Sequence, residues 1–127
     1  MKVDFLLRAE NTEGDPECMV AAVPTGSLPD YYPSDDADYV NVSERIMWRI
    51  IGTANAYDLH FPAHVSSNGF DRWVYRGAQV ECLEDELEFI FNLVNADFVK
   101  ENINRIQSVV RKVRNQPNKL ELAFEGP

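Results

Sequence analysis

The sequence contains only two cysteines, Cys18 and Cys82, among 127 residues. A disulfide framework needs more, and the two stand far from the close spacing of a zinc or redox motif. Both lie within apolar patterns, so we predict two free, buried thiols. Small size alone does not require such a framework, because a protein of this length can bury roughly two-thirds of the surface that it exposes when unfolded.

Long hydrophobic runs are also missing. No segment approaches the roughly 20 apolar residues that a membrane-spanning helix needs. Near the amino terminus, Asp4 and Arg8 interrupt the stretch that would have to form the apolar region of a signal peptide. The sequence therefore predicts a cytoplasmic protein without a membrane partner, folded as a single globular domain over residues 1–127.

Positive charge is scarce and unevenly distributed. The protein has 12 basic and 21 acidic residues, a formal net charge of -9. Residues 1–94 hold 17 acids and 6 bases, a net of -11, whereas residues 95–119 hold 2 acids and 6 bases, a net of +4. Such a protein repels nucleic acid and anionic membranes, and its natural partner is a basic protein surface. Acidic balance is also a common route to solubility.

The longest helical pattern runs from 82 to 115. Its apolar residues recur at steps of three and four positions, as Leu83, Leu87, Ile90, Phe91, Val94, Val99, Ile103, Ile106, Val110 and Val113. A break is predicted at 95–97, with Asp97 capping a second helix that ends near Asn115 and Pro117. These helices are predicted to form the apolar wall of the core.

Alternating apolar and polar residues predict strands at both ends of the sequence. Residues 2–8 and 18–23 are expected to pair as an antiparallel hairpin across a polar turn at 10–16. The alternation of leucine and phenylalanine with charged residues over 119–125 predicts a closing strand.

A second hairpin is predicted between 59–65 and 70–76, because Asn68-Gly69 is a strong signal for a tight turn. Gly77 is expected to bend the backbone before the helical stretch. With one more helix ahead of this hairpin, the order of elements belongs to the α+β class. We expect a mainly antiparallel twisted sheet of about five strands, packed on one face by two to three helices.

That earlier helix is predicted to begin at Asn41, where Glu44 completes a capping box. Its apolar face consists of Ile46, Met47, Ile50, Ile51, Ala54 and Tyr57. Trp48 points well away from this face, beside Gly52, and would be left in water unless something covers it. The cover is either the preceding loop or a second protein.

The preceding loop, residues 24–39, combines three prolines with aromatic and acidic side chains. A loop of about 16 residues is uncommon in a compact domain, and such loops are usually functional or disordered. Disordered linkers are poor in aromatics, which favours a loop that contacts a partner or covers the core. The candidate contact residues are Asp30, Tyr31, Tyr32, Asp35, Asp36, Asp38 and Tyr39.

A second acidic stretch, at 81–88, suits a partner rich in lysine and arginine. Glu84, Asp85 and Glu86 also have a structural explanation, because acids stabilise the first turn of a helix. The basic residues of 98–114 form no single stripe and have no interleaved aromatics, which argues against direct nucleic-acid binding. Pairing with acids elsewhere in the protein is their simpler role.

No stretch carries a recognised catalytic motif. Asp58, His60 and His64 form the one group of ligand-type side chains close in sequence, and on a strand they would share a face. Pro62 argues against the helix on which two histidines at this spacing bind a metal. We therefore predict no catalytic residues, no metal and no cofactor, with a small metal- or acid-dependent enzyme as an alternative.

The sequence predicts a non-enzymatic acidic protein that occludes a basic protein surface, such as that of a toxin, a nuclease or another nucleic-acid-binding protein. Immunity proteins that neutralise toxins and phage inhibitors of host defence are of this kind, and the inference is one of class. An accessory subunit of a larger assembly, in which Trp48 is permanently buried, is the alternative. No motif in the sequence identifies a known family.

Overall fold

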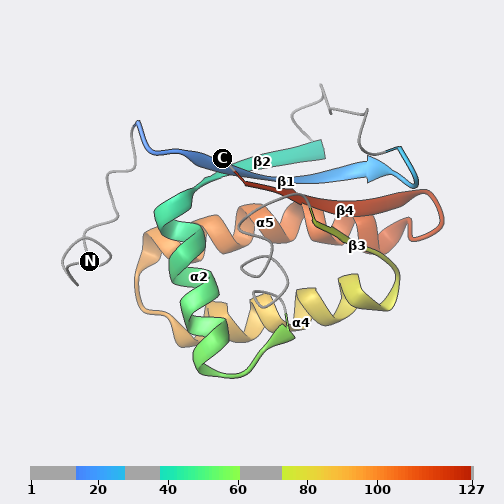
Figure 1. Ribbon diagram of the computed structural model, residues 1–127. Helices are drawn as coiled ribbons and strands as arrows, with labels where there is room; N and C mark the ends of the chain where they lie inside the picture. Colours follow the sequence, from blue (N-terminus) through green and yellow to red (C-terminus); the bar gives the residue numbers. More distant parts are fainter. Residues whose placement is uncertain (1–13, 28–37, 61–72, 127) are drawn as a thin grey trace.

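The computed structural model describes residues 14–27, 38–60 and 73–126, which form an antiparallel sheet covered on one face by helices (Figure 1). The strands are β1 (Glu17–Pro24), β2 (Tyr39–Ser43), β3 (Trp73–Tyr75) and β4 (Leu120–Glu125), in the spatial order β2-β1-β4-β3. The helices are α2 (Glu44–Ala56), α4 (Ala78–Leu93) and α5 (Asp97–Asn115). The predicted α+β class is confirmed, although this part of the protein supplies four strands where about five were expected.

The central strand β1 is buried on both faces because its residues are small or apolar. It pairs with β2 on one side and with β4 on the other. Cys18, Val20 and Ala22 face the helices, whereas Ala21 and Val23 belong to a separate small cluster on the opposite face. The predicted strand at 18–23 is therefore confirmed. Its predicted hairpin partner, 2–8, lies outside the described residues.

The opposite face of the sheet also buries a charge. Glu121 of β4 is only 1% exposed, which the alternating pattern of that strand did not indicate. Its carboxylate accepts a hydrogen bond from the backbone N–H of Gly26 at 3.1 Å and forms an ion pair with the guanidinium of Arg76. These donors compensate the loss of hydration that a buried carboxylate would otherwise suffer.

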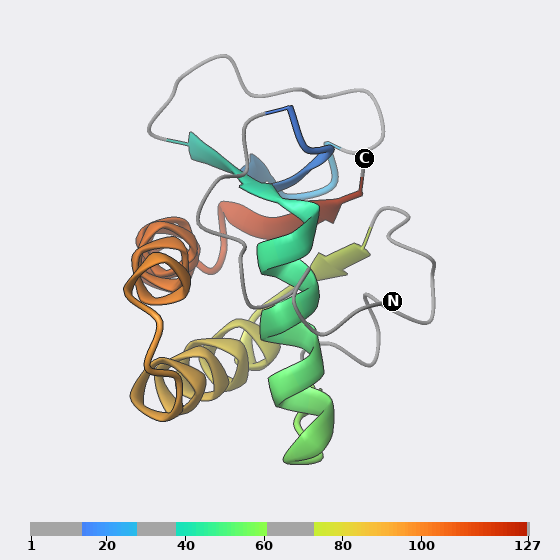
Figure 2. The same cartoon turned by 90° about the vertical axis from the view of Figure 1, so that its left-hand side faces the viewer.

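The main core lies between the sheet and the helices, all three of which pack on the same side (Figure 2). α5 contributes most through the predicted stripe, which is buried throughout and consists of Val99, Ile103, Ile106, Val110 and Val113. α2 buries its predicted apolar residues from Ile46 to Ala54, while Tyr57, the last of that set, lies beyond the helix end and is 51% exposed.

The predicted break between the last two helices is confirmed at 94–96, but both helix starts differ from the prediction. Ala96 holds the N-cap position of α5, and Asp97 is the first helical residue, where its charge favours the positive end of the helix dipole. α4 begins at Ala78 instead of 82. Gly77, at φ 53° and ψ -125°, lies in a tight turn, which is closed by a hydrogen bond from the Gln79 N–H to the Arg76 carbonyl at 3.1 Å. The backbone therefore passes from β3 directly into α4.

The prediction of a helix starting at Asn41 is wrong, because residues 39–43 form strand β2. Val42 is fully buried and Val40 packs against the same core, while Asn41 between them is exposed, as a strand requires. Pairing with β1 favours this conformation over a helical turn. The N-cap position of α2 is Ser43, whose hydroxyl donates to Asp15 Oδ2 at 2.8 Å.

Asp15 joins the start of β1 to the junction between β2 and α2. Besides Ser43, it accepts a hydrogen bond from Arg45 Nε at 2.6 Å and pairs with the rest of that guanidinium. The hydrogen bond from Arg45 is the largest cause that holds the pKa of Asp15 below its ordinary value, opposed by partial desolvation and assisted by Ser43. The carboxylate therefore favours folding in its charged form.

Asp15→Asn is expected to lower the urea midpoint of unfolding at pH 7. Because the folded pKa lies below the unfolded value of about 3.9, the wild-type advantage is present above that pH and disappears as pH falls through the folded pKa. Urea titrations of both proteins at several pH values between neutral and strongly acidic measure this. Glu17→Gln, a change at an exposed carboxylate nearby, is the control, and a pH-independent difference for Asp15→Asn would contradict the assignment.

The carboxyl end of α2 is closed by a left-handed residue, Asp58, at φ 58°. The Leu59 N–H reaches the Ala54 carbonyl at 2.9 Å, and the Asp58 N–H reaches the Asn55 carbonyl at 3.2 Å. This is the hydrogen-bond pattern of a Schellman cap, in which glycine normally occupies the left-handed position. Asp58 thus ends a helix in a conformation that costs free energy for a residue with a Cβ atom.

Replacement of Asp58 by glycine is expected to raise the free energy of unfolding by about 0.5 kcal/mol, because relief of the left-handed strain exceeds the entropy cost of glycine. Thermal or urea unfolding measures the change. Asp58→Ala retains the strain and should not stabilise the protein. Equal stability of the two variants would show that the backbone at 58 is not strained.

Candidate functional site

The predicted contact residues divide between described and undescribed parts of the protein. Those outside the described residues are Asp30, Tyr31, Tyr32, Asp35 and Asp36. Those that the structure describes are Asp38, Tyr39, Trp48, Glu84, Asp85 and Glu86. The site is therefore built from α2, α4 and the start of β2.

The two described loop residues are tied to the body of the protein. Asp38 is half-buried and pairs with the ammonium group of Lys112 on α5. Tyr39 begins β2 and packs against the small cluster on the outer face of the sheet. These contacts fix the end of the predicted loop relative to the sheet and α5.

Trp48 lies on the surface of α2, away from the buried face, with 42% of its area exposed. Its indole N–H donates to Glu44 Oε1, one helical turn earlier, at 3.3 Å. The sequence-based position of this side chain is thus confirmed. Trp48 therefore presents aromatic area at the surface of α2.

α4 directs its carboxylates to different sides. Glu84 is 8% exposed and faces α5, where it pairs with Arg111 Nε at 3.1 Å and with the guanidinium of Arg114. Its backbone carbonyl accepts a hydrogen bond from the Gln107 amide group at 2.9 Å. The structure therefore gives Glu84 an internal role, which differs from the surface role that its position in an acidic run suggested.

The side of α4 turned away from the buried residues Val80, Leu83, Leu87 and Ile90 exposes Glu81, Asp85 and Glu88, which we call the acidic ridge. They follow one another at steps of four and three residues, so they lie along one side of the helix. Among the described residues, no ion pair or side-chain hydrogen bond engages any of these three carboxylates. Only Asp85 of this set was among the predicted contact residues.

The basic residues of α5 are largely used within the molecule. Arg111 and Arg114 neutralise Glu84, and Lys112 pairs with Asp38. The ammonium group of Lys100 lies 4.8 Å from the centre of the Phe91 ring, a cation–π contact. The expectation that these cations pair with acids inside the protein is confirmed for Arg111, Lys112 and Arg114. None of these three ion pairs involves a carboxylate of the acidic ridge.

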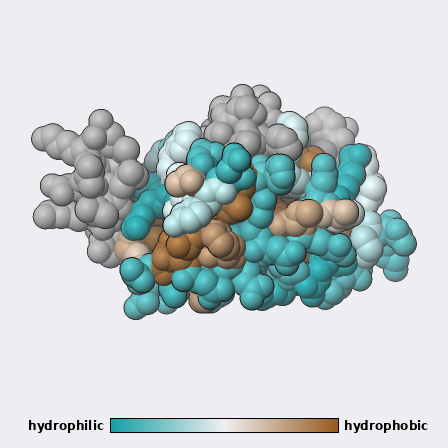
Figure 3. Space-filling model, turned by 90° about the horizontal axis from the view of Figure 1, so that it is seen from below, coloured by the Kyte–Doolittle hydropathy of each residue, from teal (hydrophilic) through white to brown (hydrophobic). Residues whose placement is uncertain are grey.

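Two exposed aromatic residues lie at the end of the acidic ridge. Tyr57, after α2, and Phe89, on α4, are 51% and 44% exposed and pack edge to face with ring centres 5.3 Å apart. Figure 3 shows a hydrophobic area on this helical side of the molecule, within a largely hydrophilic surface. We call Tyr57 and Phe89 the aromatic pair. Sequence reasoning missed Phe89, although its position next to Glu88, off the apolar stripe, is the same signal that identified Trp48.

The described candidate metal ligands, Asp58 and His60, have separate structural roles. Asp58 caps α2, and the backbone N–H of His60 donates to Glu86 Oε1 at 2.7 Å. His64 lies outside the described residues. Within the described ranges, no group of three or more histidine, cysteine, aspartate or glutamate side chains is placed to hold a metal ion.

The cysteines differ in accessibility. Cys18 is buried, and burial is the main cause that raises the pKa of its thiol to about 12, so it is expected to be unreactive. Cys82 is exposed on α4, which corrects the prediction that both thiols are buried. The prediction failed because the helix turns position 82 away from the core that Leu83 enters.

None of the helices in the described ranges is long and apolar enough to cross a membrane. Comparison with protein-family models, with curated proteins and with solved structures finds no significant match to this protein. The acidic ridge, the aromatic pair and their surroundings are therefore the features that bear on the function of this protein.

Glu84 is buried and the adjacent Asp85 is exposed, so replacing each of them should change the stability of the protein by different amounts. Glu84→Ala is expected to lower the free energy of unfolding by about 1–2 kcal/mol, because it leaves two arginines without their carboxylate. Asp85→Ala should change it by less than about 0.5 kcal/mol. Urea unfolding at neutral pH measures both, and equal effects would contradict the assigned orientation of α4.

Proposed function

We propose that this protein is a non-enzymatic binding protein that acts in the cytoplasm and occludes a basic surface of another protein. The acidic ridge, placed beside the aromatic pair, is the observation that supports it most. Exposed carboxylates with no ion pair among the described residues attract a positively charged partner, while exposed aromatic rings provide rigid contact area. The combination suits a surface rich in lysine and arginine.

The distribution of ion pairs strengthens this argument. Three of the five cations of α5, Arg111, Lys112 and Arg114, pair with Glu84 and Asp38, and none of these pairs reaches the acidic ridge on α4. An uncompensated field of this kind speeds association with a basic partner and repels nucleic acid. A toxin, a nuclease or another nucleic-acid-binding protein presents such a basic surface, and the predicted contacts at 30–36 remain part of the same proposal.

A role as accessory subunit of a larger assembly is the second candidate. The exposed area of Trp48, together with the aromatic pair, is the observation that favours it, since permanent assemblies bury apolar surface. The two roles differ in their dependence on salt. A complex held mainly by apolar burial should survive high salt, whereas steering by the acidic ridge is screened by it.

The test begins with the tagged protein in its native cell, from which bound proteins are purified at low salt and identified. The proposal predicts a basic partner that is released as ionic strength rises. Asp85→Asn combined with Glu88→Gln should lower the association rate at low salt and have little effect at high salt. Glu101→Gln, at an exposed acid on α5, is the matched control and should change the rate less.

Phe89→Ala tests the aromatic pair in the same assay. The change is expected to raise the dissociation rate and weaken binding by at least about 2 kcal/mol if Phe89 is an anchor. Its melting temperature should stay close to that of wild type, because the ring is 44% exposed. Binding that is independent of salt and insensitive to both the ridge and the Phe89 variants would refute the proposal.

A further inference from the structure

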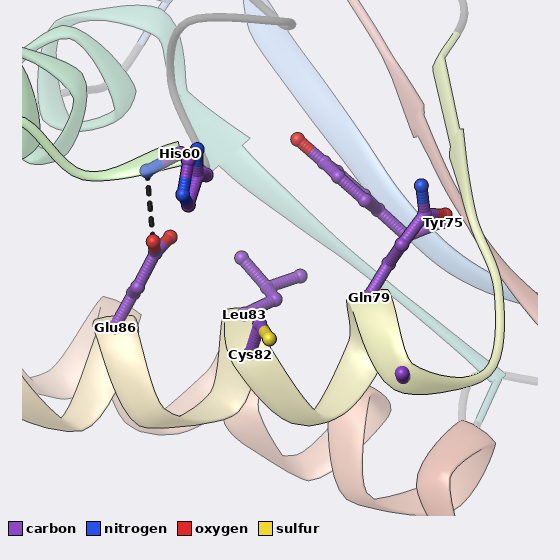
Figure 4. A pocket seen from close by; sticks show the side chains of 7 residues that line it. His60, Tyr75, Gln79, Cys82, Leu83 and Glu86 are labelled. Atoms are coloured by element: carbon purple, nitrogen blue, oxygen red, sulfur yellow. Dashed lines mark hydrogen bonds between the residues drawn. The ribbon is translucent and has the colours of Figure 1, made fainter.

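A cavity of about 290 Å³ lies between the first turns of α4 and strand β3, with His60 on its far side (Figure 4). Its size is just below the roughly 300–1,000 Å³ of clefts that bind drug-sized molecules. Leu83 and Cys82 approach it from the helix, and Tyr75 approaches it from the strand. A space of this size suits one long side chain of a partner protein.

The cavity is apolar along its walls and negatively charged at one end. The ring of Tyr75 and the side chains of Ala78 and Leu83 provide carbon surface. At the end near His60, the carboxylate of Glu86 is held by the His60 backbone N–H at 2.7 Å. None of the described lining residues is a lysine or an arginine.

The negative charge of Glu86 affects Tyr75, which lines the cavity. Burial first, and then the negative charge of Glu86, raise the pKa of the Tyr75 hydroxyl above its ordinary value. Tyr75 therefore stays protonated at neutral pH and remains neutral. A cation placed between this ring and Glu86 would meet a carboxylate and an aromatic ring.

We infer that this cavity receives one arginine or lysine side chain of the basic partner, an inference that rests on the proposed function. The aliphatic stem of such a side chain matches the carbon walls, and its charged head matches Glu86 at the end. An acidic side chain is repelled here, and a purely apolar one makes no use of the carboxylate.

The test uses n-butylguanidinium as the probe and Cys82 as the reporter. Cys82 lines the cavity and is exposed, whereas Cys18 is buried with a pKa of about 12, so alkylation by N-ethylmaleimide should report on Cys82 alone. n-Butylguanidinium is expected to slow the alkylation in a saturable manner. The neutral isostere n-butylurea, and guanidinium chloride at the same concentration, should not.

Matched variants locate the effect. Glu86→Gln keeps an oxygen for the His60 N–H but removes the charge, and it should weaken n-butylguanidinium about tenfold. Asp85→Asn makes the same charge change outside the cavity lining and should weaken it less than about twofold. Ala78→Leu fills the cavity from an exposed position and should abolish the protection. Urea midpoints confirm that all three variants fold.

Equal protection by n-butylurea, or equal effects of Glu86→Gln and Asp85→Asn, would overturn the assignment of a basic side chain. The proposed function is judged separately, because the probe experiment needs no partner. If n-butylguanidinium binds but no basic protein co-purifies, the preference of the cavity for a basic side chain stands and the proposed function fails. If a basic partner is captured with full affinity by the Ala78→Leu protein, the acidic surface stands and the cavity assignment fails.

Discussion

The packing of α5 against β1 and β4 is the contact on which the rest of the structure depends. A stripe of valine and isoleucine from Val99 to Val113 is buried there, and each fully buried side chain of this size contributes roughly 1.5–3 kcal/mol. The short connection at 94–96 joins α4 to α5 and places the two helices side by side. Burial of Val80, Leu83, Leu87 and Ile90 determines which side of α4 faces inward, and the ion pairs of Glu84 with Arg111 and Arg114 add to it.

This orientation separates the charges of the molecule. Arg111, Lys112 and Arg114 of α5 meet carboxylates within the fold, where hydrogen-bonded ion pairs are stronger than fully exposed ones. The acids on the outer side of α4 have no such counterpart in the described residues. Part of the net charge of -9 is thus concentrated on one side of α4. Solubility alone requires negative charge on the surface but does not require it to be concentrated in one place.

α4 carries most of the features that support a binding role. Its outer side presents the acidic ridge, its far end contributes Phe89 to the aromatic pair, and its first turns line the cavity that contains Glu86. All three suit a basic partner, and each can be altered without disturbing the residues that α4 buries. A single helix therefore holds an exposed aromatic ring, a charged surface and a recess in fixed relation to one another.

Periodicity alone determined the elements whose pattern is long or strict: the buried stripe of α5, the break near 95, the strand at 18–23 and the closing strand. It failed for β2, because the alternation of Val40 and Val42 is too short to outweigh a capping pattern until β1 supplies hydrogen bonds. It also could not distinguish Glu84 from Asp85, which look alike in an acidic run. Neighbours on a helix differ in direction by about 100°, so only the position of α5 decided which of them is buried with two arginines and which is exposed.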